Sequence, residues 1–281
     1  MTELEFVLNS GVRLAAHAYG NPEHPPVILS HGGGQTRHSW GETAEALAAK
    51  SWYAVSYDHR GHGDSSWSED GDYHIERFVE DQRELATRFA GKPVLVGASM
   101  GGIAAMLVEG EASEEIFHSI ILVDIVPRMD QAGAIDIIRF MGTRLEEGFA
   151  TLEEAADIIA EYTGRPRRKD VSGLNKNLRR DEDGRYRWHW DPNFVLQRDS
   201  FNKLSNPDRV AEAVQQITLP MLLVRGQMSN LVTEELAQDF LKMVPHAQYV
   251  DVADAHHMVA GDRNDVFSKA ILDFLADTSS N

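Results

Sequence analysis

Residues 94–102 read Val94-Leu95-Val96-Gly97-Ala98-Ser99-Met100-Gly101-Gly102, and this stretch decides the fold. An apolar run typical of a buried strand breaks into Gly97-x-Ser99-x-Gly101 and continues into helix-forming residues at 103–108. A serine between such a strand and helix is expected in a strained turn that lifts its hydroxyl above the sheet edge. Glycine two residues to either side removes side chains that would collide there. The stretch therefore predicts a sharp strand–turn–helix unit, a nucleophile elbow, with Ser99 at its apex; the alternative is an ordinary serine in a tight turn.

Bulk composition excludes several classes of protein. The chain has 281 residues, enough for one elaborated domain or for a core with an inserted cap. Its formal net charge of −17 argues against a nucleic-acid partner, because phosphate binding needs dominant Lys and Arg. It contains no cysteine, so it has neither a disulfide framework nor a thiolate metal site. The first residues lack a secretory pattern and no apolar run approaches about 20 residues, so we expect a cytoplasmic protein without membrane association.

Short apolar strands alternate with segments of helical periodicity along most of the chain. Alternating residues at 4–8, a turn at 9–11 and the run 12–18 predict an antiparallel hairpin. Wholly apolar strands are expected at 26–30, 54–57, 93–96, 120–123, 221–224 and 249–252, with helices around 43–50, 75–89, 101–109 and 265–275. Strands of this kind are buried on both faces, so the pattern predicts an α/β protein with a mostly parallel sheet.

The segment 127–217 has no comparable strand. Amphipathic stretches at 134–147, 152–162 and 210–216 flank a polar, aromatic middle. Because a structureless loop of this length is improbable, we expect a helical cap over 127–217, with the core formed by 1–126 and 218–281. Ligands of open parallel sheets bind at the carboxyl ends of the strands, where every candidate residue below falls.

Acyl transfer at a serine needs hydrogen-bond donors for the oxyanion, a base, and a third group that orients the base. The run His31-Gly32-Gly33-Gly34 follows an expected strand directly, and its glycines allow backbone N–H groups to turn inward. The N–H of Gly33 would then form an oxyanion hole with the N–H of Met100. The alternative is a flexible glycine loop without a ligand.

The base is expected in the loop that follows the last strand. This loop reads Asp254-Ala255-His256-His257-Met258, and His257 is preferred over His256 because it directly precedes a bulky apolar residue. Structural or solvent-facing positions are expected for four other histidines, His31, His38, His59 and His62.

The orienting acid is the least regular part of the pattern. The loop after the strand at 221–224 offers Asn230 but no carboxylate, and an amide cannot stabilise the imidazolium. Asp124 ends the previous strand and can approach the same histidine from the adjacent position in the sheet. We therefore prefer Asp124 as the acid, against a purely structural carboxylate at the turn into the cap; Asp254 remains open.

With these motifs in place, the chain resembles the α/β-hydrolase fold superfamily, in its serine esterase, lactonase and C–C hydrolase branch with an inserted cap. The run Asp58-His59-Arg60-Gly61-His62-Gly63-Asp64-Ser65 is similar to a turn of these proteins in which Asp58 and Arg60 brace loops. The run Val123-Asp124-Ile125-Val126-Pro127 is similar to a segment of some small esterases in which this aspartate is the triad acid. The resemblance implies a mostly parallel eight-stranded sheet with helices on both faces and a helical cap.

The same resemblance implies a serine hydrolase that cleaves a carboxylic ester, lactone or related activated carbonyl of a small molecule through an acyl-enzyme on Ser99. Epoxide hydrolases and haloalkane dehalogenases of this fold use aspartate as nucleophile, which Ser99 excludes. Two alternatives stay open: peroxide or oxygen chemistry without a cofactor on the same triad, and a ligand-binding homologue whose catalysis Asn230 impairs.

The cap supplies the expected substrate contacts. Residues 165–187 hold nine Lys or Arg against four acids, a local charge of about +5, which predicts either steering of anionic substrates or a solvated face. Trp188 and Trp190, followed by Phe194, either line an aromatic pocket or anchor the cap; Gly34 and His38 are the pocket candidates beside the glycine loop. No spacing predicts a metal site, a phosphate-binding loop or a dinucleotide fingerprint, so we expect no cofactor.

Overall fold

An eight-stranded sheet forms the centre of the molecule. The computed structural model describes residues 1–167, 169–196, 206–253, 255–257 and 264–278. The strands are β1 (Thr2–Val7), β2 (Arg13–Tyr19), β3 (Pro26–Ser30), β4 (Tyr53–Tyr57), β5 (Val94–Ala98), β6 (Ser119–Val123), β9 (Met221–Gly226) and β10 (Gln248–Val252). Their order is β1-β2-β4-β3-β5-β6-β9-β10; β2 pairs antiparallel with β1 and β4, and the other pairs are parallel. The predicted hairpin, the six strands and the mostly parallel sheet are confirmed, but β10 lies at the edge of the sheet, carries the exposed Asp251 and is not buried on both faces.

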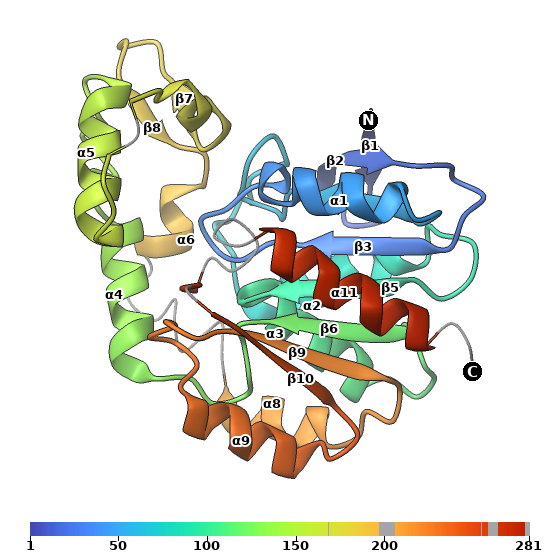
Figure 1. The fold of residues 1–281 in the computed structure, drawn as a ribbon. Helices are drawn as coiled ribbons and strands as arrows, with labels where there is room; N and C mark the ends of the chain where they lie inside the picture. Colours follow the sequence, from blue (N-terminus) through green and yellow to red (C-terminus); the bar gives the residue numbers. More distant parts are fainter. Residues whose placement is uncertain (168, 197–205, 254, 258–263, 279–281) are drawn as a thin grey trace.

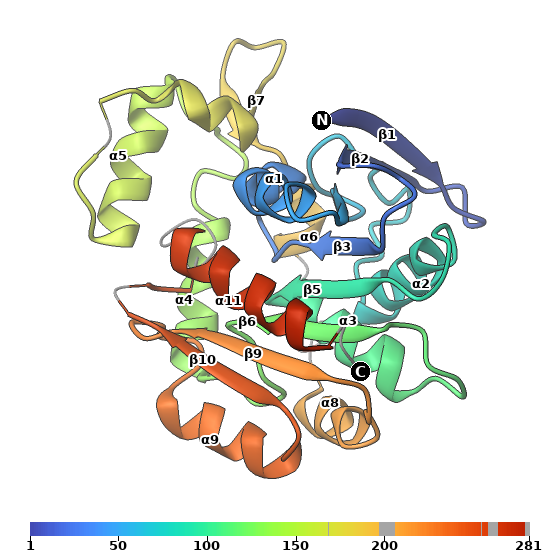
Figure 2. The ribbon, with the colours of Figure 1, turned by 45° about the vertical axis from the view of Figure 1, so that its right-hand side comes forward.

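Helices cover both faces of this sheet (Figures 1 and 2). One face carries α1 (Gly41–Ala48) and α11 (Asn264–Thr278). The other carries α2 (Ile75–Ala86), α3 (Met100–Gly110), α8 (Pro207–Val214) and α9 (Glu234–Met243). Helix α11 includes the helix expected at 265–275 and ends at Thr278, the last residue that the structure describes.

Alternation along each strand divides the core into two apolar clusters. In β5, Leu95 packs with the cluster under α2 and α3, whereas Val94 and Val96 pack with the cluster under α1 and α11. All three side chains are at most 1% exposed. Since successive side chains of a strand point to opposite faces, a strand covered on both faces must be apolar throughout. This requirement explains why these strands were visible in the sequence as unbroken apolar runs.

The chain between β6 and β9 contains helices and one short hairpin. The elements are α4 (Gln131–Met141), α5 (Leu152–Thr163), a 3-10 helix (Ser172–Lys176), β7 (Leu178–Arg180), β8 (Tyr186–Trp188), α6 (Pro192–Leu196) and α8. In Figures 1 and 2, α4, α5, β7 and α6 stand beside the carboxyl ends of the parallel strands. Helix α8 instead packs on α3, where a Cβ added at Gly110 would collide with the backbone of Ala213.

Buried polar contacts join the core to residues 127–217, the segment for which a cap is expected and which is called the cap below. Asp191, 2% exposed, accepts a hydrogen bond from the Tyr73 hydroxyl at 2.6 Å, and its N–H donates to the Gly61 carbonyl at 2.8 Å. At the rim, the Arg179 guanidinium lies 4.5 Å from the centre of the Trp67 ring. These contacts fix the cap over the loop that follows β4.

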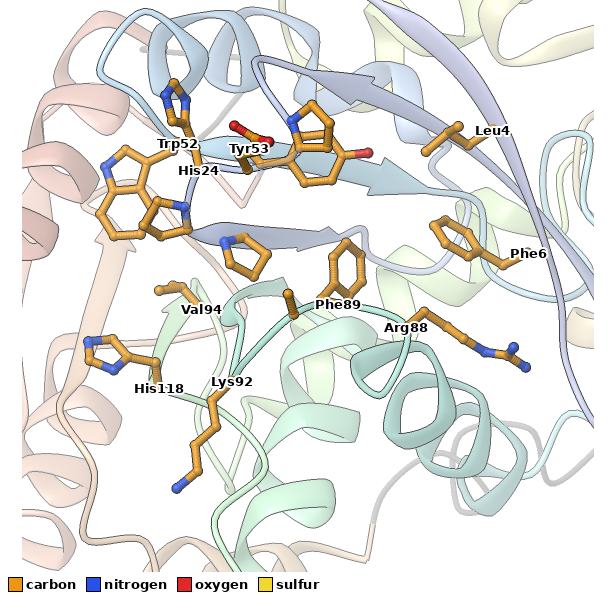
Figure 3. A pocket seen from close by; sticks show the side chains of 15 residues that line it. Leu4, Phe6, His24, Trp52, Tyr53, Arg88, Phe89, Lys92, Val94 and His118 are labelled. Carbon is orange, nitrogen blue, oxygen red and sulfur yellow. The ribbon is translucent and has the colours of Figure 1, made fainter.

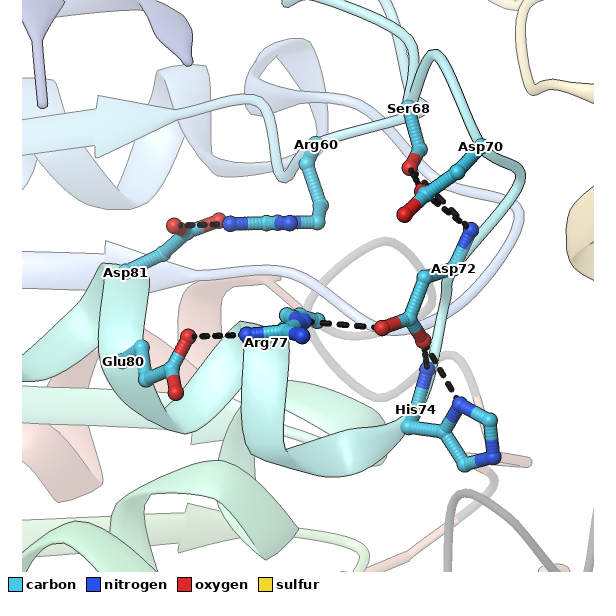
Figure 4. Close-up of polar contacts among 8 residues, drawn as sticks. All are labelled: Arg60, Ser68, Asp70, Asp72, His74, Arg77, Glu80 and Asp81. Atoms are coloured by element: carbon cyan, nitrogen blue, oxygen red, sulfur yellow. Dashed lines mark hydrogen bonds and ion pairs between the residues drawn. The ribbon is translucent and has the colours of Figure 1, made fainter. Parts of the chain in front are cut away.

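That loop, residues 58–65, is held by ion pairs, as the resemblance implied. Asp58 is fully buried and accepts hydrogen bonds from the backbone N–H groups of Arg37 at 2.6 Å and Asp64 at 3.0 Å. Arg60 forms two parallel hydrogen bonds with Asp81 of α2, at 2.5 and 2.6 Å (Figure 4). Burial raises the pKa of Asp81 although Arg60 opposes the shift, so this carboxylate depends on its partner. The paired bonds tie the loop to α2.

No helix among the described residues combines the length and the apolar character needed to cross a membrane.

Candidate active site

Ser99 lies in a strained turn between β5 and α3. Its backbone has φ +46° and ψ −117°, a conformation that residues other than glycine rarely adopt, and its side chain is partly exposed. A Cβ added at Gly97 would lie 2.7 Å from the Gly102 Cα, and one at Gly101 would collide with Ser30. The surrounding atoms therefore leave no room for a side chain at positions 97 and 101, as the glycine spacing predicted. This turn places Ser99 at the carboxyl end of β5.

Asp124 follows the neighbouring strand and lies beside this turn. Ala98 is paired with Val123 in the parallel register, and the Ser99 N–H donates to the Val123 carbonyl at 3.3 Å. The Asp124 side chain is completely buried, and its Oδ2 lies 2.7 Å from Nδ1 of His257. The structure thus brings Ser99, Asp124 and His257 to one edge of the sheet, although residues 99 and 257 are far apart in sequence.

Three hydrogen-bond donors surround the Asp124 carboxylate. Besides His257, the N–H of Gly226 donates to Oδ1 at 3.0 Å and the hydroxyl of Ser229 donates to Oδ2 at 2.5 Å. The Ser229 Oγ in turn accepts from the N–H groups of Leu231 and Val232, at 3.1 and 3.2 Å. Such donors stabilise a buried carboxylate in its charged form. Sequence reasoning missed Ser229 because it searched this loop for a carboxylate and not for a hydroxyl.

The other candidates for acid and base lie differently. Asn230 is exposed, and its carbonyl packs against Gly133 of α4. His256 is also exposed, whereas the His257 side chain is only 18% exposed. Asp254 and Met258 lie outside the described residues. Of the candidates that the structure describes, His257 and Asp124 are the pair in contact.

The glycine loop runs directly beside Ser99. A Cβ added at Gly32 would lie 3.0 Å from the Ser99 Cβ. The Gly32 N–H donates to the Gln35 side chain at 3.0 Å, and the Gly34 N–H donates to Nε2 of His62 at 3.1 Å. The N–H groups of Gly33 and Met100, by contrast, meet no acceptor among the described residues. Gly33 is half-buried, and Met100 is the first residue of α3, where a helix leaves its N–H groups without a backbone partner, so these two amides are candidates for binding a ligand oxygen.

Buried histidines lie beneath this loop. His31, His59 and His62 are fully buried and their rings touch, with 4.6 Å between the centroids of His31 and His59 and 5.3 Å between those of His31 and His62. Burial is the main cause that lowers the pKa of His31 to about 4 and that of His62 to about 3. Burial and the two neighbouring histidines also lower the pKa of His59. All three rings are therefore neutral at neutral pH.

Apolar side chains of the cap cover the glycine loop. A Cβ added at Gly33 would lie 3.3 Å from the Phe194 ring, and one at Gly34 would lie 3.0 Å from Cε of Met141. Trp188 and Trp190 stack on each other deeper in the cap, with centroids 4.7 Å apart and exposures of 4% and 3%. The His38 ring packs against His17 of β2, and burial lowers its pKa to about 4. Among the described residues, the side chains of Met141 and Phe194 thus lie over Gly33 and Gly34.

Much of the positive charge at residues 165–187 is paired within the cap. Arg187 forms ion pairs with Asp181 at 2.9 Å and Asp183 at 2.8 Å, and Arg179 pairs with Asp181 at 3.0 Å. Arg185 donates to the carbonyls of residues 147 and 148. These contacts favour the solvated-face interpretation of the charge run.

A pocket of about 660 Å³ lies at the other edge of the sheet (Figure 3). Its lining includes Pro26, Tyr53 and Val94, which begin β3, β4 and β5, whereas Ser99 follows the end of β5. Its cationic side chains have partners: Arg88 pairs with Glu84, and Lys92 with Glu115. This pocket is therefore separate from the site around Ser99.

Comparison with known proteins gives the same architecture. The model of the alpha/beta hydrolase family matches residues 27–270. An esterase of Mycobacterium tuberculosis is 28% identical over 249 residues, covering 85% of this chain and 78% of its own length, and a 3-hydroxybutyrate-oligomer hydrolase of Cupriavidus necator is 26% identical over 260 residues, covering 87% of each. The solved structure of E-2-(acetamidomethylene)succinate hydrolase superimposes with a TM-score of 0.82 at 20% identity, covering 98% of this chain and 99% of that one. The sheet order, the serine turn and the family match together show that this chain belongs to the alpha/beta hydrolase family.

Proposed function

We propose that this protein is a serine hydrolase that cleaves a carboxylic ester, lactone or related activated carbonyl of a small molecule through an acyl-enzyme on Ser99. The observation that carries the proposal is the buried Asp124 carboxylate, which contacts His257 at 2.7 Å directly beside the strained Ser99 turn. The relatives named as esterases and hydrolases support the same reaction class.

In the first half of the reaction, Ser99 Oγ attacks the substrate carbonyl while Nε2 of His257 takes the hydroxyl proton. Asp124 holds the proton on Nδ1, which leaves Nε2 free to act as the base, and its charge stabilises the imidazolium that forms. The imidazolium then protonates the departing alcohol. In the second half, Nε2 of His257 takes a proton from a water that attacks the acyl-serine, and it donates this proton to Ser99 Oγ as the acid is released.

The N–H groups of Gly33 and Met100 supply the oxyanion hole in this mechanism. Both belong to backbone beside Ser99, and neither donates to an acceptor among the described residues. Donors already in place for the developing charge need no reorganisation during the reaction, and loss of one such donor typically costs 10²- to 10³-fold in kcat.

The cap favours an apolar group on the substrate. Met141 and Phe194 stand over Gly33 and Gly34, so the part of the substrate next to the reacting carbonyl meets a thioether and an aromatic ring. We therefore propose small acyl esters with an aliphatic or aromatic acyl group as substrates.

The alternative of a non-catalytic ligand-binding homologue was motivated by Asn230. Its exposed position and the Asp124–His257 contact remove the reason to regard the site as impaired. Cofactor-free peroxide or oxygen chemistry would use the same serine and histidine. A dependence of turnover on peroxide or oxygen distinguishes that chemistry from ester hydrolysis.

Labelling of the serine tests the proposal directly. The folded protein is treated with a fluorophosphonate probe and digested, and the adduct is located by mass spectrometry, in parallel with hydrolysis of p-nitrophenyl butyrate. We expect one adduct on Ser99, loss of labelling and turnover in Ser99→Ala, and full activity in the exposed control Ser172→Ala. Folded protein in which Ser99 stays unlabelled, or turnover that requires peroxide, contradicts the proposal.

A further inference from the structure

Two histidines outside the catalytic triad, His31 and His62, contact the backbone of the glycine loop. Around Gly33, the loop is fixed on both sides by imidazole rings. Nδ1 of His31 lies 2.7 Å from the Gly32 carbonyl, and Nε2 of His62 lies 3.1 Å from the Gly34 nitrogen. One ring therefore holds the peptide before Gly33, and the other holds the peptide after it.

The partners of each ring determine its tautomer. Because the Gly34 N–H is a donor, Nε2 of His62 must carry the lone pair, and its Nδ1–H then donates to the Arg60 carbonyl at 3.1 Å. The same logic applies to His31: its Nε2 accepts from the His59 N–H at 3.0 Å, so its Nδ1–H donates to Gly32. Both rings are thus neutral and protonated at Nδ1.

The surroundings of His62 preserve this neutral form. The ring is fully buried, the Phe194 ring packs against it edge-on with centroids 4.7 Å apart, and its pKa is lowered to about 3. A proton on Nε2 would oppose the Gly34 N–H, so the contact needs an acceptor at this position over the whole working pH range. The Arg60 carbonyl that orients the ring belongs to a residue anchored by the buried pair with Asp81.

We propose that His62 and His31 position the Gly33 N–H for the oxyanion. His31 holds the Gly32 carbonyl and His62 holds the Gly34 N–H, and these two contacts are called the clamp below. This inference rests on the proposed function, and it makes His62 a positioning residue and not a catalytic one. The Gly34 N–H donates to His62 and the Gly32 N–H to the Gln35 side chain, which leaves the Gly33 N–H as the amide of this loop without an acceptor among the described residues. A displaced donor reduces the stabilisation of the transition state more than it reduces the affinity for substrate, so we expect the effect in kcat.

A pair of substitutions separates positioning from packing. His62→Phe keeps the ring shape against Phe194 and removes the acceptor, whereas His62→Gln places an amide oxygen near the position of Nε2. We expect His62→Phe to lower kcat for p-nitrophenyl butyrate about 10- to 100-fold with KM changed less than about twofold, and His62→Gln to recover most of the loss. The affinity for a trifluoromethyl ketone, which forms an oxyanion adduct with the serine, is expected to fall in proportion to kcat/KM.

The matched control is His246→Phe. His246 is an exposed histidine that precedes β10, at the opposite edge of the sheet from Ser99, with its Nε2 3.1 Å from the Leu219 carbonyl, and its replacement is expected to leave kcat unchanged. Equal kcat in His62→Phe and wild type, or equal losses in His62→Phe and His62→Gln, would overturn the clamp.

A second measurement does not depend on activity. Long-range ¹⁵N–¹H spectra of the folded wild-type protein are expected to show His31 and His62 as neutral rings protonated at Nδ1. A His62 protonated at Nε2 would refute the clamp even if the His62→Phe protein fails to fold. Wild-type protein that is unlabelled at Ser99 but shows these tautomers would refute the proposed hydrolase and leave the histidine contacts standing.

Discussion

Replacing Asp124 by Asn is the sharpest perturbation of the proposed mechanism. Three donors converge on this carboxylate, from Gly226, Ser229 and His257. The Gly226 N–H is fixed by the backbone, so the single oxygen of an asparagine is expected to face it. The amide NH₂ then points at Nδ1 of His257, which must give up its proton to accept.

This rearrangement places the histidine proton on Nε2, where it cannot take the proton of Ser99. In a serine protease the same change lowers turnover about 10⁴-fold, equivalent to about 5.5 kcal/mol, and we expect a loss of that order here. The fold should persist, because Asp124 has φ +49° and asparagine adopts the left-handed region readily.

The assay is kcat for p-nitrophenyl butyrate in Asp124→Asn beside Asn230→Asp. Asn230 is exposed, so its replacement is expected to change kcat less than about twofold. An Asp124→Asn protein that retains a tenth of the wild-type rate would refute the assignment of the acid. A tenfold gain from Asn230→Asp would show instead that the acid that orients His257 works from the loop after β9.

Three further predictions concern the surroundings of the site. Ser229→Ala removes a donor to the buried carboxylate, so we expect kcat to fall about 10-fold in the same ester assay; an unchanged rate would contradict a role for this hydroxyl. Arg60→Met leaves Asp81 buried without its partner and should lower the free energy of unfolding in urea by about 3–5 kcal/mol, while adding Asp81→Leu restores most of it; a double variant no more stable than the single one speaks against this account. His31 and His62 are neutral when folded, with pKa values of about 4 and about 3, but titrate near 6.5 when unfolded. The unfolded chain therefore binds more protons below pH 6.5, and the stability that these groups contribute is complete above that pH and falls as the pH drops toward their folded pKa values. From pH 7 to 4.5 each should account for about 2.5 kcal/mol, so the acid loss measured by urea unfolding should be smaller in His62→Gln, and an equal loss would exclude His62 as a cause.

Local chemistry along the chain was sufficient to predict the core of the fold. Strands buried on both faces must be apolar at every position, and the strand at 120–123 shows this pattern without interruption. The turn at Ser99 was predicted for a similar reason, since only glycine tolerates the backbone contacts at positions 97 and 101. In the segment 127–217, the hairpin β7–β8 was missed because its strands have three residues each and carry three arginines and two aromatic residues instead of an apolar run.

The preference for Asp124 over Asn230 came from a resemblance and from adjacency in a parallel sheet, and the contact with His257 agrees with it. The hydroxyl of Ser229 had no signal in the sequence. Its importance depends on a distance of 2.5 Å between loops 105 residues apart, which no local pattern encodes. The acceptor that His62 offers to Gly34 joins two further loops in the same way.

By itself, the sequence determined the strands, the serine turn and the residue types available for acyl transfer, because each of these depends on neighbours within a few positions. Only the tertiary structure decided which histidine meets which carboxylate, which amides of the glycine loop keep a free N–H, and which rings hold that loop in place. The physical reason is that hydrogen bonds between buried side chains depend on the relative placement of separate loops to within a few tenths of an ångström. That placement follows from how the sheet and its helices pack as a whole.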